Sequence, residues 1–254
     1  MGLFDKKFCS ICGDKIGLLG NRKLTDGNLC KNCAAKLSPW FSERRNSSTQ
    51  EIREQLEYRE ANRGAVASFH VTKSLGDGMR LLLDEDRQQF VVTRARDLVE
   101  ANPDVLSFSQ VTGVEIDIDE DRSEVKTKDR EGKPVSYNPP RYVFSYDFDV
   151  IISVNHPYFN EIRYQLNPSG IKINPDAPVP ANRAMNPRLN RDYREYEALA
   201  NEIKSTLQNV RRQVREEIRA AAAPKQAVTC PWCGATTTPD ASGCCEYCGG
   251  AVNA

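Results

Sequence analysis

At 254 residues, the chain is long enough for two or three small domains, and its 35 basic and 35 acidic residues leave no overall charge to recruit nucleic acid or an anionic membrane. Its nine cysteines form two clusters near the ends, which disfavours a secreted disulfide scaffold and favours metal sites in a reducing compartment. No apolar run approaches the roughly 18 residues of a membrane span, and the N-terminus shows no signal-peptide pattern, so we expect a cytoplasmic protein.

The N-terminal cysteines form two Cys-x-x-Cys pairs, made of Cys9, Cys12, Cys30 and Cys33. Four thiolates at this spacing suit a tetrahedral Zn²⁺ site, with Zn–S bonds of about 2.3 Å. Turn signals between the pairs predict a β-hairpin, and the second pair opens a predicted helix that ends at Leu37. We therefore expect a treble-clef or zinc-ribbon finger over residues 1–45. Disulfide bonding, or two unrelated thiol pairs, is the alternative.

The same stretch, from MGLFDKKFCSICGDK to LSPWFSERR, resembles the opening of a bacterial family known as domain of unknown function 4428. The four cysteines are the specific part of this resemblance, which covers the finger and the residues that follow it. The resemblance implies a metal site and a bacterial cytoplasm. It implies no activity and no substrate.

Charge is spread unevenly along the chain. Residues 1–45 hold nine basic and four acidic residues, whereas residues 65–175 hold thirteen basic and eighteen acidic residues. Four thiolates with one Zn²⁺ sum to a charge of about −2, so part of the positive surplus offsets the metal centre. The same surplus is a candidate nucleic-acid surface, made of Lys15, Arg22, Lys23, Lys31 and Lys36.

Residues 46–64 predict a helix that links the finger to the rest of the chain. Ser47, Ser48 and Thr49 are candidate N-caps, and Glu51 stands three residues after Ser48, as in a capping box. Acidic and basic residues alternate beyond this start with few apolar ones between them. We expect a mostly solvated helix.

From Ala65 the apolar pattern changes to a period of two, which indicates strands. Apolar runs predict strands at residues 66–71, 79–83, 90–92, 111–118, 142–154 and 161–166, with a short helix at 97–101 and a polar loop at 119–139. We expect an antiparallel sandwich or half-open barrel over residues 65–186. Its last part is a proline-rich linker or strap in extended conformation.

The order of these strands, followed by a long helix, is similar to the pleckstrin-homology-like binding modules of bacteria. Lipid-binding members need a basic first hairpin, whereas Lys73 and Arg80 are surrounded here by acidic residues. The resemblance therefore implies binding of a peptide or protein at a sheet edge, rather than binding of an inositol phosphate.

No catalytic constellation can be assembled from the sequence, and we expect that the protein is not an enzyme. His70, on a predicted strand, and His156, in a predicted turn, have no cysteine or second histidine nearby and are expected to be structural. The acidic run from Asp117 to Asp121 lacks the central glycine and the closing glutamate of a calcium loop. We expect it to be a solvated loop.

Residues 187–223 predict a long amphipathic helix, followed by Pro224. Its apolar seam recurs at spacings of three and four residues, through Tyr193, Tyr196, Ala200, Ile203, Leu207, Val210 and Val214. Such a seam suits a coiled coil or packing on the chain's own β core. No acidic residue is placed to pair with Lys204 and Arg211 across a coiled coil, so we favour the intramolecular cap and a monomer.

Residues 224–254 contain a second set of paired cysteines, made of Cys230, Cys233, Cys245 and Cys248. A glycine follows each pair, as in a small zinc ribbon. A thiol-redox motif needs a helix after its first pair, and Gly234 and Pro239 prevent one. Cys244 is either a spare thiol or a competitor of Cys245. The segment has few apolar residues, so we expect its metal to supply the free energy of folding.

Together these observations predict an α+β chain with three parts: a treble-clef or zinc-ribbon finger, an antiparallel β-rich, pleckstrin-homology-like core closed by a long helix, and a small zinc ribbon. They predict two zinc ions and a non-enzymatic interaction or adaptor protein of the bacterial cytoplasm, with a protein partner. One alternative is a nucleic-acid-binding protein that uses the basic finger. The other is a thiol-redox or metal-handling protein that uses the C-terminal cysteines.

Overall fold

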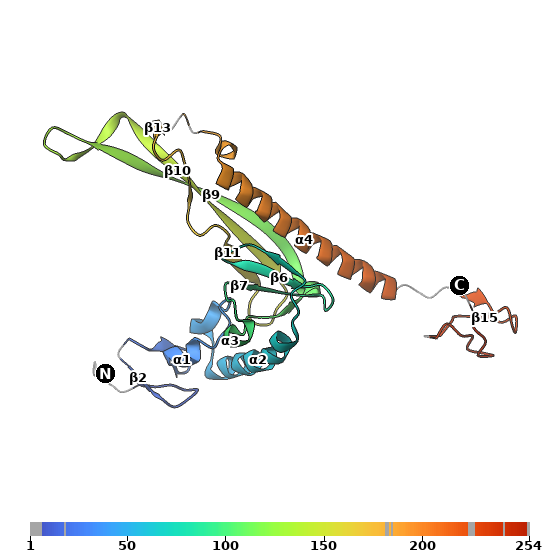
Figure 1. The fold of residues 1–254 in the computed structure, drawn as a ribbon. Helices are drawn as coiled ribbons and strands as arrows, with labels where there is room; N and C mark the ends of the chain where they lie inside the picture. The colour runs from blue at the N-terminus through green and yellow to red at the C-terminus, as the bar shows by residue number, and fades with distance from the viewer. Residues whose placement is uncertain are drawn as a thin grey trace. The chain divides into compact units, whose positions relative to one another are not determined.

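The computed structural model describes residues 7–17, 19–180, 183, 185–222, 227–240 and 242–252. The chain forms two compact units, Met1–Arg211 and Arg212–Ala254, and the boundary falls within the long helix α4 (Arg191–Ala222) (Figure 1). Helix, antiparallel sheet and two terminal cysteine clusters are all present, which confirms the predicted α+β class. Among the described residues, none of the helices combines the length and apolar character needed to cross a bilayer.

The N-terminal finger consists of two small hairpins and one turn of helix. Strand β1 (Lys7–Phe8) pairs with β2 (Lys15–Ile16), and β3 (Arg22–Lys23) pairs with β4 (Asn28–Leu29). The short helix α1 (Lys31–Ala34) follows directly. The predicted hairpin and helix therefore both form, with one further hairpin around the first cysteine pair.

Helix α2 (Thr49–Ser68) begins with the predicted capping box. The Glu51 amide donates to Ser48 Oγ at 3.3 Å, and the Ser48 amide donates to Glu51 Oε2 at 2.6 Å. The helix is longer than predicted, so the expected strand at residues 66–71 is wrong, and His70 lies in an irregular segment. Val66 lies on the buried face of the helix, whereas Val71, beyond the end of the helix, is exposed.

One face of α2 is buried, although the sequence predicted a mostly solvated helix. Its residues recur at spacings of three and four, as on one face of a helix, and they are Ile52, Gln55, Arg59, Asn62 and Val66. Three of these five side chains are polar, so the sequence shows no apolar stripe. The prediction of a mostly solvated helix is wrong for this face, which faces the protein.

The first sheet has four antiparallel strands in chain order. They are β5 (Lys73–Leu75), β6 (Arg80–Asp84), β7 (Gln89–Thr93) and β8 (Leu106–Ser107). Helix α3 (Leu98–Ala101) lies between β7 and β8; Asp97 caps it and Asn102, in the left-handed conformation, ends it, as the predicted short helix requires.

The second sheet is built on a long ribbon of two antiparallel strands, β9 (Val111–Lys128) and β10 (Pro134–Val154). The other edge of β10 pairs successively with β11 (Glu161–Gln165), β12 (Ile171–Ile173) and β13 (Val179–Pro180). The predicted polar loop at residues 119–139 is wrong, because both strands continue through most of it. Residues 119–124 of β9 are all exposed, so no apolar alternation marks the strand there.

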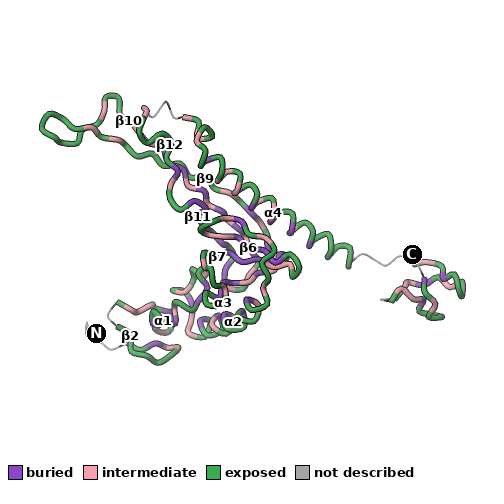
Figure 2. Tube along the Cα trace, in the orientation of Figure 1, coloured by how far each residue is buried: buried purple, intermediate pink, exposed green. Residues whose placement is uncertain are grey.

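The first part of helix α4 packs on the second sheet (Figures 1 and 2). Tyr193 makes edge-to-face contacts with Tyr146 and Phe148 of β10, at centroid distances of 5.2 and 5.1 Å. Ile203 and Leu207 have no exposed surface within this single chain. The helix therefore caps the sheet of its own chain, as favoured, and the monomeric state stays a prediction.

The C-terminal unit contains one small hairpin, in which β14 (Val228–Thr229) pairs with β15 (Thr236–Thr237). An isolated bridge joins Cys244 to Ala251. Among the described residues, the buried apolar cluster of this unit consists of Cys230, Cys245 and Val252, with Val228 packed against them. This small core fits the expectation that the unit needs a metal. The predicted helix stop at Pro224 lies outside the described residues.

Candidate metal centres

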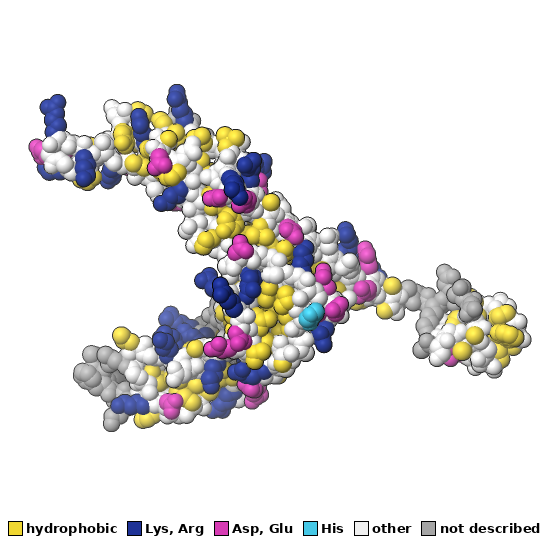
Figure 3. Space-filling view, viewed as in Figure 1, with side chains coloured by type: hydrophobic (Ala, Val, Ile, Leu, Met, Phe, Trp, Pro, Cys, Tyr) yellow, Lys and Arg dark blue, Asp and Glu magenta, His cyan; other side chains and the backbone are white. Residues whose placement is uncertain are grey.

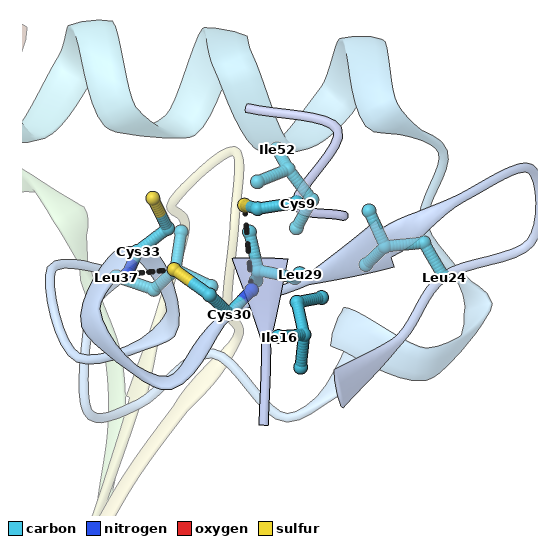
Figure 4. Close-up of a cluster of buried hydrophobic side chains, with 8 residues drawn as sticks. All are labelled: Cys9, Ile16, Leu24, Leu29, Cys30, Cys33, Leu37 and Ile52. Carbon is cyan, nitrogen blue, oxygen red and sulfur yellow. Dashed lines mark hydrogen bonds between the residues drawn. The ribbon is translucent and has the colours of Figure 1, made fainter. Parts of the chain in front are cut away.

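The N-terminal centre is assembled from two elements. Its ligands come from the turn after β1 and from α1, and their four Sγ atoms lie within 4.8 Å of one another: Cys9, Cys12, Cys30 and Cys33. Cys30 is the N-cap of α1, so the first turn of the helix carries the last two ligands, as predicted. Figure 4 shows three of these sulfurs beside the buried side chains of the finger. The exposed ligand is Cys12.

Backbone amides point at the sulfurs of this centre. The Cys30 amide donates to Cys9 Sγ and the Cys33 amide donates to Cys30 Sγ, each at 3.3 Å (Figure 4). Burial raises the pKa of Cys9, but the amides of Cys12, Cys30 and Ile11 outweigh it and lower the pKa to about 6. These amides therefore favour the thiolate, which is the form that binds a metal.

The finger and the start of α2 form one structural unit. Ile52 of α2 lies fully buried in the same cluster as the cysteines. Arg53 donates to the carbonyl of Ser10 at 3.1 Å, and the Thr49 amide donates to Asp26 Oδ1 at 2.7 Å. A Cβ on Gly27 would stand 2.8 Å from Thr49 Oγ1, so this close approach requires glycine.

The C-terminal centre has the same arrangement of four clustered cysteines in a smaller unit. The Sγ atoms of its four ligands also lie within 4.8 Å of one another: Cys230, Cys233, Cys245 and Cys248. Burial raises the pKa of Cys245, but the amides of Tyr247 and Cys248 outweigh it and lower the pKa to about 6. Cys244 stands outside the group, with its Sγ 3.8 Å from the carbonyl of Ser242. The geometry therefore selects Cys245 over Cys244 as the ligand.

The sulfur–sulfur distances distinguish a metal centre from disulfide bonding. A tetrahedron with metal–sulfur bonds of about 2.3 Å has edges of about 3.8 Å, whereas a disulfide bond is about 2.05 Å long. The distance is 3.7 Å between Cys12 and Cys30, 3.6 Å between Cys230 and Cys248, and 3.8 Å between Cys233 and Cys245. All nine cysteines are free thiols. Both groups therefore have the dimensions of a tetrahedral tetrathiolate site.

Three glycines shape the turns that present the sulfurs. Gly13, Gly234 and Gly249, which directly follow Cys-x-x-Cys pairs, have φ angles of 77°, 71° and 69°. In this left-handed region a residue with a Cβ is strained. The glycine that follows each of these pairs therefore lets the backbone turn without strain.

The two histidines lie outside both groups. The His70 amide donates to Asp84 Oδ2 at 2.8 Å. The ring of His156 stacks on Phe159 at a centroid distance of 4.0 Å and meets Tyr58 edge-on at 5.0 Å, and burial lowers its pKa. The contacts of His156 fit the structural role that was expected of it, whereas the contact of His70 is made by its backbone, and its exposed side chain leaves that role a prediction. The run from Asp117 to Asp121 lies on β9 rather than in a loop.

The basic residues of the finger remain available to solvent. Four of the five candidates, Lys15, Lys23, Lys31 and Lys36, are exposed, and Arg22 is half-buried. No signal in the sequence singled out Arg59, a buried cation of α2, because it stands within a run of alternating charges.

Each of these two groups of four cysteines could hold a metal ion, as the cysteines of a zinc finger do. Residues 7–55 match the family model described as Domain of unknown function (DUF4428), which confirms the resemblance of the N-terminal stretch. The matched segment includes Ile52 and therefore the whole core of the finger. No curated protein and no solved structure matches the chain.

Proposed function

We propose that this protein is a non-enzymatic, zinc-binding adaptor of the bacterial cytoplasm that holds one Zn²⁺ at each end and binds a protein partner. The observation that carries the proposal is the closure of both centres. In each of them four cysteines could complete the tetrahedron around one metal ion, which would leave no position for a substrate or a reactive water. Such a site stabilises a fold and performs no chemistry.

The donor set supports zinc as the metal. Four thiolates in a tetrahedron suit Zn²⁺ or iron, and they disfavour Mg²⁺ and Ca²⁺, which take oxygen ligands. Zn²⁺ has no redox chemistry and no geometric preference from d-electrons, so it fits a purely structural role in a reducing compartment.

Exposed aromatic side chains on the C-terminal unit support a protein partner. Trp232 is 74% exposed and Tyr247 is 72% exposed, and each occupies the third position of its Cys-x-x-Cys pair. Tryptophan and tyrosine are enriched at protein–protein contacts because they bury a large area with little loss of conformational freedom. A metal-stabilised ribbon that presents them at equivalent positions is suited to such a contact.

The proposal is tested by capture of partners on the full chain. The wild-type protein, a Trp232→Ala/Tyr247→Ala variant and a Cys244→Ser control are immobilised and exposed to bacterial cytoplasm. We expect a defined protein that the wild type and the control retain and that the aromatic variant releases. Equal retention by all three chains, or turnover of a substrate by the purified protein, contradicts the proposal.

Three further predictions stay open to experiment. Nucleic-acid binding through Lys15, Arg22, Lys23, Lys31 and Lys36 requires an affinity that falls with salt. A thiol-redox role requires a reversible disulfide in the metal-free C-terminal unit. The pleckstrin-homology-like interpretation of the core predicts a ligand at a sheet edge.

A further inference from the structure

Beyond a short pairing with β13 at its base, the end of the β9–β10 ribbon forms an arm with no other strand beside it among the described residues. We call residues 122–142 the basic arm. β13 pairs with β10 at Arg141 and Tyr142, and closer to the turn β10 pairs only with β9 within the described part of the chain. Nearly all of its residues are exposed. A two-stranded ribbon without a core gains little from hydrophobic burial, so its conformation depends on strand pairing and on contacts between its side chains.

Charge is segregated along the ribbon. The basic arm holds six basic and three acidic residues, although the whole chain is neutral. The part of the ribbon between the basic arm and the core is acidic instead. There Asp117 and Asp119 of β9 lie directly opposite Asp149 and Asp147 of β10. Figure 3 shows Lys and Arg side chains (dark blue) projecting at the arm's end of the ribbon.

The strand register places cations on both faces of the arm. Arg122, Lys126 and Lys128 stand at alternate positions of β9 and therefore share one face, since successive residues of a strand point to opposite faces. Val125, on the other face, pairs with Arg141 of β10. The arm therefore carries three cations on one face and Arg141 on the other.

Two tyrosines lie among these cations. The guanidinium of Arg141 lies over the ring of Tyr137, 4.7 Å from its centroid, and that of Arg122 lies over Tyr142 at 5.8 Å. Both rings are half-buried in an otherwise exposed arm. The arrangement interleaves aromatic rings with positive charge, as in proteins that bind single nucleic-acid strands.

Most cations of the arm have no acidic partner. One ion pair forms within it, between Lys133 Nζ and Glu131 Oε2 at 2.9 Å. Within the described residues, Lys126, Lys128 and Arg130 have no carboxylate within 4 Å. Their charges are therefore free to neutralise an external anion.

We propose that the basic arm binds the phosphodiester backbone of a nucleic-acid strand. The site is separate from the finger and from the protein-binding role proposed above. Cations on both faces suit a strand or groove that surrounds a ribbon, whereas a membrane surface would contact one face only. The interleaved tyrosines offer stacking surfaces for bases.

The test uses the full zinc-loaded chain and fluorescently labelled single-stranded RNA and DNA of about 20 nucleotides, with binding followed by anisotropy across a salt titration. The arm variant is Lys126→Gln/Lys128→Gln/Arg130→Gln. The matched control, Lys15→Gln/Lys31→Gln/Lys36→Gln, removes three exposed charges from the finger. A third variant, Glu124→Lys, adds charge to the same face of the arm. Circular dichroism checks the fold of each chain.

We expect the arm variant to lose at least about tenfold in affinity. The slope of log affinity against log salt concentration should become shallower by about 2, since each phosphate contact contributes about 0.7 to the slope for a single strand. The finger control should bind like the wild type, and Glu124→Lys should bind more tightly. Comparison of RNA with DNA identifies the preferred strand. Absence of wild-type binding, loss of binding in the finger control alone, or binding of anionic lipid vesicles in place of both oligonucleotides overturns the proposal.

Discussion

Arg59 of α2 and Asp104, 45 residues further along the chain, form a buried ion pair of 2.6 Å between Nη1 and Oδ1. Their side chains are 8% and 0% exposed. The second carboxylate oxygen accepts from Ser38 Oγ at 2.8 Å, and the guanidinium also donates to the carbonyls of Lys36 and Asn102. One pair of charges thus joins the end of the finger, α2 and the loop after α3.

This pair predicts a large cost for removing one partner. Arg59→Met leaves Asp104 buried without its cation, and we expect a loss of about 3–5 kcal/mol in the free energy of unfolding. Removing both charges, as in Arg59→Met/Asp104→Leu, should restore most of that loss. Urea unfolding measures both variants.

The matched control is an exposed pair. Arg191 Nε lies 2.6 Å from Glu195 Oε1 on the surface of α4, and Arg191→Gln should cost less than about 1 kcal/mol. Equal costs for Arg59→Met and Arg191→Gln would show that the buried network does not hold the finger to the core.

The pair also marks the limit of what the sequence predicts. Cysteine spacing predicted both groups of ligands, because Cys-x-x-Cys pairs are local patterns whose geometry is short-range. Apolar alternation found part of the core strands, as at residues 111–118, and a continuous apolar run found the strand at residues 79–83. The buried stripe of α2 and the outer half of the ribbon carry polar residues, so neither periodicity marked them. A contact such as Arg59 with Asp104 depends on the tertiary fold, which no local pattern encodes.

Asp84 predicts a pH-dependent contribution to stability. Burial raises its pKa, but the amides of His70 and Arg87 and the charge of Arg87 outweigh it and lower the pKa. A carboxyl whose folded-state pKa lies below its unfolded value of about 3.9 stabilises the fold above that pH. The contribution is lost as the pH falls through the folded-state pKa.

Asp84→Asn should therefore destabilise the protein at pH 7, and the difference from the wild type should shrink in acid. Chemical denaturation at a series of pH values measures it. Asp86→Asn, at an exposed position two residues further on, is the control. A difference that stays constant down to the acid limit would contradict the assignment.

The seam of α4 predicts a core-like cost for truncation. Leu207→Ala removes a fully buried side chain and should cost about 2–5 kcal/mol. Gln208→Ala, at the adjacent exposed position, should change stability little. Light scattering should show a monomer for the wild type and for both variants. A stable dimer that Leu207→Glu converts to a folded monomer would show that the seam serves assembly.

The β core should fold without metal. Its sheets contain no cysteine, and Phe148 of β10 packs against Tyr193 of α4 rather than against either centre. Treating the full chain with a chelator should remove the metal and leave the strand signal in circular dichroism. Loss of that signal would show that the finger and the core fold as one cooperative unit.

The metal content of the purified chain tests the central claim most directly. Elemental analysis should find two zinc ions per wild-type chain. It should find one in Cys12→Ser and one in Cys233→Ser, while Cys244→Ser, which alters the thiol outside both groups, should retain two. About one zinc in the wild type, or iron with visible absorbance, would contradict the account.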